Sequence, residues 1–594
     1  MQKVDYRNVI FKDGFWKRKE SLNHDVTLGA VYDRFKETGR IDAFSCKWKP
    51  GDPNKPHFFW DSDVAKWIEG ASYDISRTHD PDLMEKAEWL IDRIEENQGD
   101  DGYFNIYYTV VEKSGRFTLR SNHELYCAGH LMEAAVAYYE ATGRDRFLKI
   151  MEKYASYIKS VFMDGDGNVK PAFQTSGHEE IELALYKLYK ATGNRDWLEL
   201  FRFFVDKRGN NPLDPVEEYT QSNLPVRKIR RAVGHSVRAG YLYAAMADYA
   251  REFGDSEMAE ACRLVFNDIT SKRIYVTGGI GSEAHGERFG EDYALGNLSA
   301  YAETCASIAM MLFAQRMNLL ERNARYADIV ELEMYNGMLS GVSLDGDSFF
   351  YQNVLEIDDS QNISYSHTVK RRAKLFECSC CPPNINRTLA SMEQYFYSKE
   401  GNAVYINQFG NSEYCENGIR VVQETRYPMD GKIRIKISGA DLIYVRIPGW
   451  CSEFKASQGY AKCNGYAVFA NPKDIMIDFC MKPVFVKADK RIKDTLGKVA
   501  VKYGPIVYCA ESCDNIKDLN RIRLNITNPE WEITCDEVHC VCMLEMNGFE
   551  VDSPSLNLYS ELYSKMINKR IRLIPYHMFA NRDISNMKVW IEKA

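Results

Sequence analysis

The sequence has no apolar run that could cross a membrane and no secretory signal at its start. No stretch of the 594 residues approaches the roughly 20 consecutive apolar residues of a membrane-spanning helix. The opening segment MQKVDYRNVIFKDGFWKRKE carries basic residues without the apolar run that a secretory signal places behind them. We therefore expect a cytoplasmic protein with no membrane partner.

The sequence also lacks an excess of basic residues and any block of like charge. Its formal net charge is -8, whereas a general nucleic-acid binder shows a basic excess. We therefore expect no nucleic-acid partner. With 45% hydrophobic and 27% charged residues, the chain has the composition of an ordinary globular protein. Its length predicts about two to four domains.

Residues 1–397 are predicted to be mainly helical. Segments such as LMEAAVAYYEATG, EEIELALYKLYKATG and AGYLYAAMADYAREFG place apolar residues at three- and four-residue spacing. Each of these three follows a Gly-His pair, and the pairs lie roughly 50 residues apart, the length of a helical hairpin. Stacked hairpins form an open solenoid or close into a ring, and we expect a closed (α/α)6 barrel.

The histidines of these pairs are His130, His178 and His235. If the inner helices of a barrel start at one rim, all three side chains lie on that rim. Two interpretations follow. Each histidine is a helix-start or core residue, or the three converge to form a polar ligand pocket.

After residue 397 the pattern changes to that of strands. Segments such as KIRIKISGADLIYVRIPGW and KVAVKYGPIVYCA alternate apolar and polar residues or form short β-branched runs between turns. The predicted fold class is therefore multidomain, α then β. We expect the barrel over 1–397, a β-sandwich over 398–504 and a second β-sandwich-like domain over 505–594.

Three of the sixteen cysteines gather in FECSCCPPN. Adjacent cysteines such as Cys380 and Cys381 rarely bridge each other, and in a reducing compartment such a cluster suits zinc, which takes thiolate and carboxylate ligands. Glu303 and Cys305 of AYAETCASIAM are the best further donors, although residues two apart do not share a helix face. A redox thiol pair and incidental packing are the other two interpretations.

The glycine-rich segment TGGIGSEAHGERFGEDYALGN offers several carboxylates: Glu283, Glu287, Glu291 and Asp292. Its glycines do not lead from a strand into a helix with the spacing of a phosphate-binding loop. We interpret it either as the source of a general acid/base or as a solvated surface loop.

Together, CAGHLMEAA, GHEEIELAL, GHSVRAGYLYAAMAD, TGGIGSEAHGERFG, YAETCASIAM and CSCCPPNINR resemble glycoside hydrolase family 127, the bacterial β-L-arabinofuranosidases. The resemblance covers essentially the whole chain. It implies an (α/α)6 barrel followed by β-sandwich domains, and a zinc cofactor. The implied activity is a retaining release of β-linked L-arabinofuranose from an oligosaccharide or glycoconjugate.

The same resemblance implies the residues of the site. The implied zinc ligands are Glu303, Cys305, Cys380 and Cys381. Cys380 corresponds to the nucleophile, Glu287 to the acid/base, and Cys378 to a further pocket cysteine without an assigned role. A thiolate would thus replace the carboxylate nucleophile of most retaining glycosidases, and zinc would remove its proton. The implied sugar-binding residues are His130, His178, His235 and Tyr351.

Other functions remain as hypotheses. One is hydrolysis of a different L-sugar or of a branched acidic sugar from pectin, which would favour a pocket arginine such as Arg288 or Arg387. Another is a sugar epimerase on the same barrel, which needs no thiolate. A third is a carbohydrate-binding or zinc-structural protein without turnover. A homodimer through the β domains is the oligomeric state that we expect.

Overall fold

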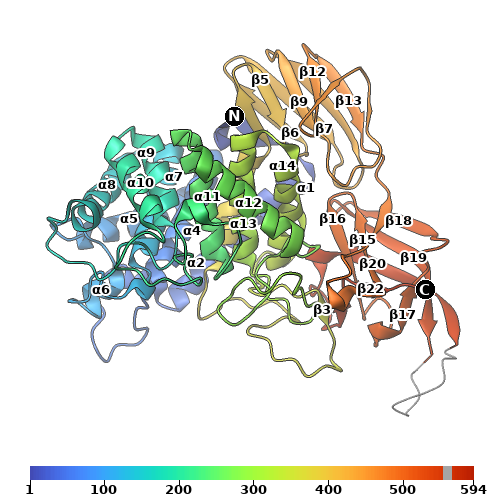
Figure 1. Ribbon diagram of the computed structural model, residues 1–594, viewed down its shortest axis with the longest axis horizontal. Coiled ribbons are helices and arrows are strands. Elements are labelled where there is room, and N and C mark those ends of the chain that lie inside the picture. The colour runs from blue at the N-terminus through green and yellow to red at the C-terminus, as the bar shows by residue number, and fades with distance from the viewer. Residues whose placement is uncertain (553–564) are drawn as a thin grey trace.

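The chain forms a helical region followed by two groups of β-strands, as the sequence predicted (Figure 1). The computed structural model describes residues 1–552 and 565–594. In Figure 1 the helices fill one side of the molecule, and the strands coloured orange and red fill the other. Among the described residues, no helix combines the length and the apolar character needed to cross a membrane.

Within the described part of the chain, six helices contact one another in a closed cycle, so that each touches the next and the last touches the first. We call this set the inner ring. Its members are α4 (Trp60–Thr78), α7 (Glu124–Thr142), α9 (Ile181–Thr192), α11 (Ser236–Phe253), α13 (Thr304–Glu321) and α15 (Cys381–Leu389).

A second helix covers each member of the inner ring. Five of these follow their partner directly in the chain, and α2 packs on both α4 and α15. The covering helices are α2 (Leu28–Glu37), α5 (Pro81–Asn97), α8 (Arg146–Lys159), α10 (Arg195–Lys207), α12 (Ser256–Lys272) and α14 (Ala324–Leu332). The remaining α-helices of the described residues are α1 (Gly14–Leu22), α3 (Arg40–Ala43) and α6 (Ile106–Val110).

Burial of each helix follows from its place in this arrangement. The covering helix α10 buries one face, with Trp197, Phe201 and Phe204 at helical spacing. The inner-ring helix α11 is buried along nearly its whole length, because helices pack on both of its sides. Its Gly240 is required there, since a Cβ atom would lie 2.6 Å from the Cβ of Ala309 on α13.

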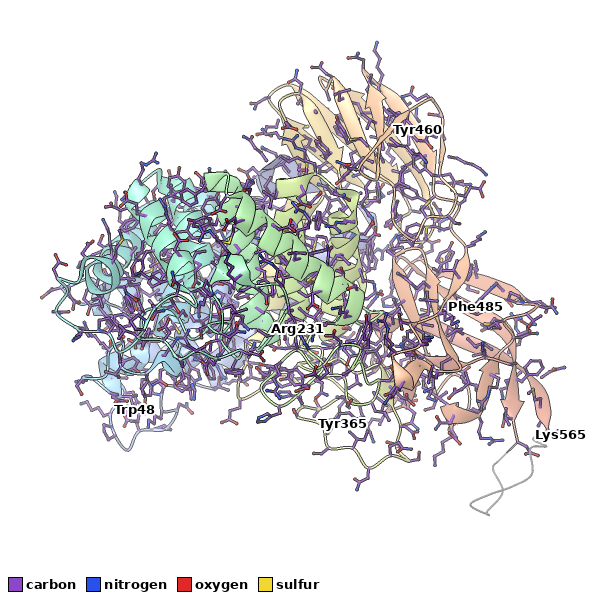
Figure 2. All side chains as sticks on the ribbon, in the orientation of Figure 1. Trp48, Arg231, Tyr365, Tyr460, Phe485 and Lys565 are labelled. Atoms are coloured by element: carbon purple, nitrogen blue, oxygen red, sulfur yellow. The ribbon has the colours of Figure 1, made fainter. Side chains whose placement is uncertain are left out.

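The helices of the inner ring run in the same direction. Residues that precede or begin α4, α7, α11, α13 and α15 line one cavity, and residues from later turns of the same helices line another. The long loops before α13 and α15 gather near the first end, at the lower edge of Figure 1, and Figure 2 places Tyr365 among them. The chain start lies at the upper end, beside β5. The two ends of the ring therefore have different surroundings.

Two sheets make up the middle region, with strand orders β1-β4-β5-β9-β12-β11 and β10-β13-β8-β7-β6-β2. Each takes an edge strand from the chain start, which we expected to belong to the helical region alone: β1 pairs with β4, and β2 with β6. In β8 every second residue is buried, as in a sheet with one covered face. The strands are β1 (Gln2–Lys3), β2 (Val9–Phe11), β4 (Tyr397–Glu400), β5 (Ala403–Ile406), β6 (Ser412–Glu416), β7 (Ile419–Thr425), β8 (Lys432–Ser438), β9 (Leu442–Arg446), β10 (Lys455–Ala456), β11 (Ala461–Cys463), β12 (Tyr466–Ala470) and β13 (Asp474–Asp478).

The third sheet begins before the expected boundary at 504/505. β14 (Pro483–Val486) and β15 (Lys498–Tyr503) are hydrogen-bonded in one sheet with β16 (Ile506–Glu511), and Gly504 turns β15 into β16 with a φ of +55°. The expected boundary therefore falls inside a hairpin. The turn at Gly504 had been interpreted as a break between domains, but it joins two paired strands. The other strands here are β3 (Glu356–Ile357), β17 (Ile522–Leu524), β18 (Trp531–Asp536), β19 (Val541–Val551), β20 (Met566–Pro575), β21 (Met587–Lys588) and β22 (Ile591–Glu592).

Candidate active site

A cavity of about 210 Å³ lies where the helices of the inner ring begin. It collects side chains from the starts of several ring helices and from the two long loops. Because the N-terminal ends of helices carry partial positive charge, this end of the ring favours anionic groups. The lining residues are Phe58, Phe59, Ser62, Asp63, His123, Tyr126, His178, Tyr219, His235, Val237, Arg238, Glu287, Glu303, Cys305, Tyr351, Cys378 and Cys380.

Three thiols and one carboxylate converge at this cavity. The Sγ atom of Cys305 lies 3.6 Å from that of Cys380 and 3.4 Å from that of Cys381. Oε1 of Glu303 lies 3.5 Å from Sγ of Cys380 and 3.7 Å from Sγ of Cys381. The four sequence-predicted metal ligands therefore form one compact cluster.

Local structure explains how residues two apart contribute to the same cluster. Glu303 has extended backbone angles (φ -59°, ψ 139°) and immediately precedes α13, so the helix-face restriction does not apply to it. Cys305 is the second residue of the helix. On the other side, Pro382 and Pro383 occupy the first turn of α15, where a missing N–H costs nothing. They fix the helix start that carries Cys380 and Cys381.

The donor set fits a zinc ion. Tetrahedral zinc with Zn–S bonds of about 2.3 Å would separate its sulfur ligands by about 3.8 Å, close to the 3.4–3.8 Å between the three Sγ atoms. Oε2 of Glu303 is buried and has no hydrogen-bond partner. Burial, together with the neighbouring Cys380 and Glu287, raises the pKa of Glu303 well above its usual value. A divalent cation would relieve this crowding of like charges.

Glu287 faces the same cavity from the glycine-rich loop. Its backbone has a φ of 52° and follows Gly286, whose φ is 72°. The carboxylate accepts a hydrogen bond of 2.7 Å from the Tyr301 hydroxyl and lies 3.4 Å from the Tyr351 hydroxyl. Its other oxygen lies 2.7 Å from Nε2 of His235. The loop conformation thus places the carboxylate of Glu287 beside His235, Tyr301 and Tyr351.

The tautomer of His235 follows from its position at the start of α11. Its Nδ1 atom accepts hydrogen bonds from the backbone N–H groups of Val237 and Arg238, so the proton of the neutral ring is on Nε2, which donates to Glu287. Burial lowers the pKa of His235. Burial raises the pKa of Glu287, but hydrogen bonds from His235 and Tyr301 outweigh it and bring that pKa down to about 2. The pair therefore rests as a neutral imidazole and a carboxylate.

Tyr351 links the carboxylate to the thiols. Its hydroxyl lies 3.2 Å from Sγ of Cys380 and 3.9 Å from Sγ of Cys378. A hydrogen bond with Cys380 and then burial raise the pKa of Cys378, which therefore remains a thiol. Cys380 and Glu287 both lie within 3.4 Å of the same hydroxyl.

The three Gly-His histidines do not lie at one level. His178 and His235 line the cavity, with ring centroids 5.5 Å apart. His130 is the seventh residue of α7 and is fully buried, with its ring 4.5 Å from that of Tyr126, which lines the cavity. The sequence placed His130 at a helix start, but α7 begins six residues earlier. His130 therefore lies one layer behind the pocket wall.

The acidic loop divides its four carboxylates between two roles. Glu283 pairs with Arg288 and Glu291 pairs with Arg231, and all four of these side chains are substantially exposed. Asp292 pairs with Arg273 and is about one-third exposed. Only Glu287, of the four, lines the cavity. Glu287 therefore faces the cavity, while Glu283 and Glu291 belong to a solvated surface loop.

Several residues in the cavity wall or beside it were not found from the sequence. Tyr301 lies two residues before Glu303 and its hydroxyl donates to Glu287, but the left-handed Ala302 between them (φ 44°), which sets this position, is not visible in the sequence. His123, Tyr219 and Arg238 gave no signal, because isolated residues of these types are common in helical cores. The imidazole of His367 stacks on Tyr351 at 4.2 Å, from a loop without periodicity.

The arginines proposed for an acidic substrate lie elsewhere. Arg288 is on the exposed loop, and Arg387 is bonded to Glu69 and Glu133 in the interior of the ring. Arg238 lines the cavity instead, and its guanidinium lies over the ring of Tyr219 at 4.5 Å.

Carboxyl groups and cysteine side chains around one small cavity, with histidines and tyrosines as hydrogen-bonding partners, are compatible with a glycoside-cleaving enzyme. Family models narrow this class. The model for the β-L-arabinofuranosidase GH127 catalytic domain matches residues 8–394, that for the GH127 middle domain residues 403–475, and that for the family 127 C-terminal domain residues 483–592. The chain belongs to glycoside hydrolase family 127 and is a glycoside hydrolase.

Individual relatives agree with this assignment. The chain is 35% identical to a non-reducing end β-L-arabinofuranosidase of Bifidobacterium longum subsp. longum, over 90% of this chain and 89% of the relative. The crystal structure of a GH127 β-L-arabinofuranosidase from Geobacillus stearothermophilus T6 superposes with a TM-score of 0.92 at 36% identity, over 99% and 100% of the two chains. A GH127 β-arabinofuranosidase gives 0.90 at 33% identity, over 100% and 98%.

Proposed function

We propose that the protein is a retaining glycosidase that releases β-linked L-arabinofuranose from the non-reducing end of an oligosaccharide or glycoconjugate. The relatives named as β-L-arabinofuranosidases support the sugar. The carrying observation is that Cys380 and Glu287 share one hydroxyl partner, Tyr351. This keeps the two groups within about 7 Å of each other, compatible with the roughly 5–5.5 Å of retaining enzymes.

Cys380 would act as the nucleophile. Glu303, Cys305 and Cys381 would hold a zinc ion together with Cys380, and the donor distances support that ligand set. A bound zinc ion would keep the coordinated cysteines as thiolates at neutral pH. Sγ of Cys380 faces the cavity, whereas Cys381 is fully buried. Of these two cysteines, Cys380 is therefore the one that a sugar could reach.

Glu287 would act as the acid/base in two steps. In the first, Glu287 has taken a proton from solvent in the complex with substrate; Sγ of Cys380 forms a bond to the anomeric carbon while the bond to the leaving oxygen breaks, and Glu287 gives that proton to the leaving oxygen. In the second, Glu287 takes a proton from water, whose oxygen attacks the anomeric carbon as the C–S bond breaks. His235, whose Nε2–H donates to Glu287, orients the carboxylate and stabilises its charged form for the second step.

The sugar would be held by the polar groups around these two residues. His178, His235 and Tyr351 line the cavity and can exchange hydrogen bonds with furanose hydroxyls. His130 would act through Tyr126, whose ring it contacts at 4.5 Å, and not by direct contact. Fixing the ring orientation in this way brings the anomeric carbon to Cys380 in near-attack geometry.

The fold that carries this site supports an (α/α)6 barrel followed by β-sandwich domains. The closed cycle of the inner ring and its covering helices support the barrel. The two six-stranded sheets of the middle region support the first sandwich. We propose three domains, with the last beginning at β14 and not at residue 505.

A trapping experiment tests the mechanism. An aryl β-L-arabinofuranoside with a reactive leaving group would be mixed with the enzyme and quenched. Mass spectrometry should then find one arabinosyl group on the peptide that carries Cys380. The product first seen by proton NMR should be the β-anomer, and metal analysis should find about one zinc per chain. A first product of α configuration, or an adduct on a carboxylate, would contradict the proposal.

A panel of substrates separates the alternatives. Arg238 has no carboxylate within 4.0 Å among the described residues, so aryl glycosides of an acidic sugar belong in the panel beside other L-sugars. An epimerase would convert a free sugar without cleaving any glycoside, and replacing Cys380 by alanine would leave that activity intact.

A further inference from the structure

A second, larger cavity lies at the opposite end of the inner ring. Its volume is about 600 Å³, within the range of small-molecule sites. Later turns of α4, α7, α9, α11, α13 and α15 line it, and β1 covers it from the side of the middle sheets. It shares no lining residue with the cavity that holds Cys380 and Glu287. The proposed hydrolysis does not use this cavity.

Most charges around this cavity are neutralised within the protein. Arg387 contacts Glu69 at 2.8 Å and Glu133 at 2.6 Å. Lys187 contacts Glu69 at 2.9 Å. Arg316 contacts Asp248 at 2.6 Å. These ion pairs form the wall of the cavity and leave little net charge for a ligand to satisfy.

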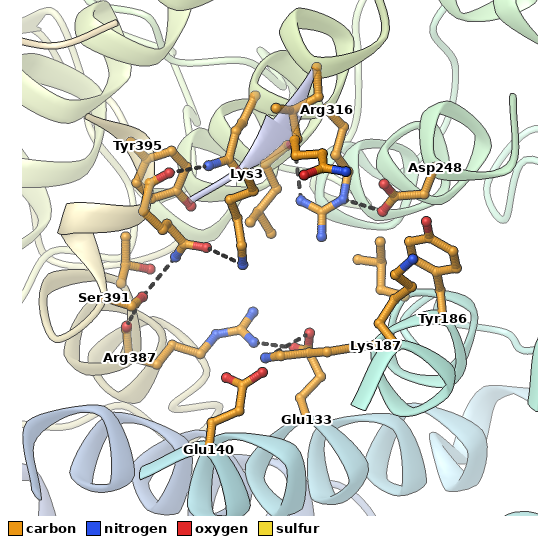
Figure 3. A pocket seen from close by; sticks show the side chains of 18 of the residues that line it. Lys3, Glu133, Glu140, Tyr186, Lys187, Asp248, Arg316, Arg387, Ser391 and Tyr395 are labelled. Atoms are coloured by element: carbon orange, nitrogen blue, oxygen red, sulfur yellow. Dashed lines mark hydrogen bonds and ion pairs between the residues drawn. The ribbon is translucent and has the colours of Figure 1, made fainter. Parts of the chain in front are cut away.

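Three polar side chains that line the cavity are less committed. The ammonium group of Lys3 makes one hydrogen bond, of 3.3 Å, to Gln394, and has no carboxylate within 4.0 Å among the described residues. Among the residues that the structure describes, the carboxylate of Glu140 and the hydroxyl of Tyr395 find no hydrogen-bond or ion-pair partner. Figure 3 shows Lys3 and Glu140 pointing into the hollow from opposite sides, with Arg316 beside Lys3.

The charged groups near Lys3 determine the electrostatic potential in the second cavity. Lys3 is exposed overall; loss of hydration where its ammonium group faces the cavity lowers its pKa, Glu140 raises it, and Lys187 and Arg316 lower it. Lys3 and Glu140 thus influence each other across the cavity without direct contact. A molecule between them must satisfy a donor on one side and an acceptor on the other.

We propose that this cavity is a second carbohydrate-binding site, which takes a neutral sugar of one or two rings between Lys3, Glu140 and Tyr395. A sugar hydroxyl both donates and accepts a hydrogen bond, so one ring can satisfy the ammonium and the carboxylate together. The rings of Tyr73, Tyr186 and Tyr395 add flat apolar surface to the lining.

The charges argue for a neutral ligand over an anion. A phosphate or carboxylate near Lys3 would also meet Glu140, which has no cation within 4.0 Å among the described residues to offset it. A cation would meet Lys3 and Arg316 in the same way. The site is independent of the proposed function, because none of its residues contacts Cys380 or Glu287 and the proposed reaction does not require it.

The test is a binding experiment on the full-length, zinc-loaded enzyme. L-arabinose, D-galactose, D-glucose and maltose would be titrated and followed by calorimetry and by saturation-transfer NMR. The variant Lys3→Met/Glu140→Met removes both hydrogen-bonding groups and keeps side-chain volume. Glu85→Met, an exposed glutamate of α5 away from both cavities, is the matched control. Thermal unfolding would verify that each variant is folded.

At least one of these sugars should bind the wild-type protein with an affinity that falls about tenfold or more in the double variant and is unchanged in the control. Hydrolysis of an aryl glycoside should stay within about twofold in both variants. If the double variant does not fold, Tyr395→Phe replaces it and should weaken the same sugar. Crystals soaked with that sugar should show it in the cavity.

Two results would overturn the proposal. In one, no sugar of the panel shows binding that depends on Lys3, Glu140 or Tyr395. In the other, sodium phosphate or acetate binds in a manner that depends on Lys3 while the sugars do not, which would make the cavity an anion site. Failure to find hydrolysis of β-L-arabinofuranosides would leave this test unaffected, since the readout is sugar binding.

Discussion

The two ends of the inner ring are formed by the same helices, but their buried arginines differ in their ion-pair partners. Arg238 lines the cavity at the helix starts and has no carboxylate within 4.0 Å among the described residues. Arg387 lines the cavity at the other end and is bonded to Glu69 and Glu133. Both side chains are almost completely buried. The buried arginine of the first end therefore has no ion-pair partner among the described residues, whereas the buried arginine of the second end has two.

The helix α15 runs from one end of the inner ring toward the other. It begins with Cys381, next to the thiol cluster, and its Arg387 lies two turns later in the ion network. A Cβ atom at Gly70 of α4 would lie 3.0 Å from the backbone nitrogen of Arg387, so the two helices pack closely here. The ion pairs of Arg387 hold the later part of α15 in the ring, while its start lies at the thiol cluster. Four predictions test this division, from the largest effect to the smallest.

Replacing Cys380 by alanine should reduce kcat/KM for an aryl β-L-arabinofuranoside at least about a thousandfold, as loss of a nucleophile does in other enzymes. The physical reason is that no other thiol takes its place: Cys381 is fully buried, and Cys378 is held as a thiol. The measurement is steady-state kinetics with zinc content determined on the same samples. Cys262→Ala, at a fully buried cysteine of α12, is the control and should retain activity. Comparable losses in both variants would contradict the assignment.

Replacing Arg387 by methionine should lower the free energy of unfolding by about 3–5 kcal/mol, because two buried carboxylates, Glu69 and Glu133, lose one of their two cations. Glu69 retains Lys187 at 2.9 Å, whereas Glu133 keeps it only at 3.5 Å. Urea unfolding measures the effect. Arg238→Met is the matched comparison: it should change stability much less and should instead raise KM. Equal destabilisation by both substitutions would mean that the two ends do not differ in the proposed way.

The sequence predicted the helical and β-rich regions because their periodicities differ and extend over many residues. It also proposed Glu303, Cys305, Cys380 and Cys381 as partners, and the structure brings them together. That grouping came from resemblance, since spacing alone argued against two residues in i and i+2 positions on one helix. The extended backbone of Glu303, which removes the objection, is not visible in the sequence.

Other features depend on contacts between distant segments and so escaped prediction. His130 lies behind Tyr126 because α7 starts earlier than the Gly-His pair suggested. The third sheet includes β14 and β15 because β15 pairs with β14, with β16 and, from the end of the chain, with β22. The second cavity joins later turns of separate helices to Lys3, which β1 brings across from the middle sheets. No local pattern marks such a space.

Replacing Glu287 by glutamine should reduce kcat/KM to an extent that depends on the leaving group of the substrate. An arabinofuranoside with an alcohol leaving group needs a proton in the first step, so its kcat/KM should fall about a hundredfold or more. A dinitrophenyl leaving group departs without a proton and should lose much less in that step. Stopped-flow measurement of aryl release gives the first step directly. His235→Asn, which removes the partner at 2.7 Å, should give a smaller loss of the same pattern. Equal losses for both leaving groups would contradict the role of acid.

The smallest effect concerns two glutamates of α7, one at each end of the ring. Burial raises the pKa of Glu133, but Lys187 and Arg387 outweigh it and leave that pKa low. Glu124 has no cation within 4.0 Å among the described residues: burial raises its pKa to about 8, although hydrogen bonds from Tyr103 and the Phe117 N–H, and the more distant Arg116, oppose the rise.

The folded protein should therefore bind a proton at Glu124 that the unfolded chain releases between its ordinary pKa of 4.5 and about 8. Stability should then fall as the pH rises through that window, by at most about 1.4 kcal/mol per pH unit from this group. Glu124→Gln keeps a donor and an acceptor in place but cannot ionise. Its unfolding temperature relative to the wild type should rise steadily from pH 5 to pH 8, whereas Glu85→Gln on the surface of α5 should show no such trend. A constant difference across the window would mean that Glu124 is ionised in the folded state, and that a buried carboxylate needs no cation at this end of the ring.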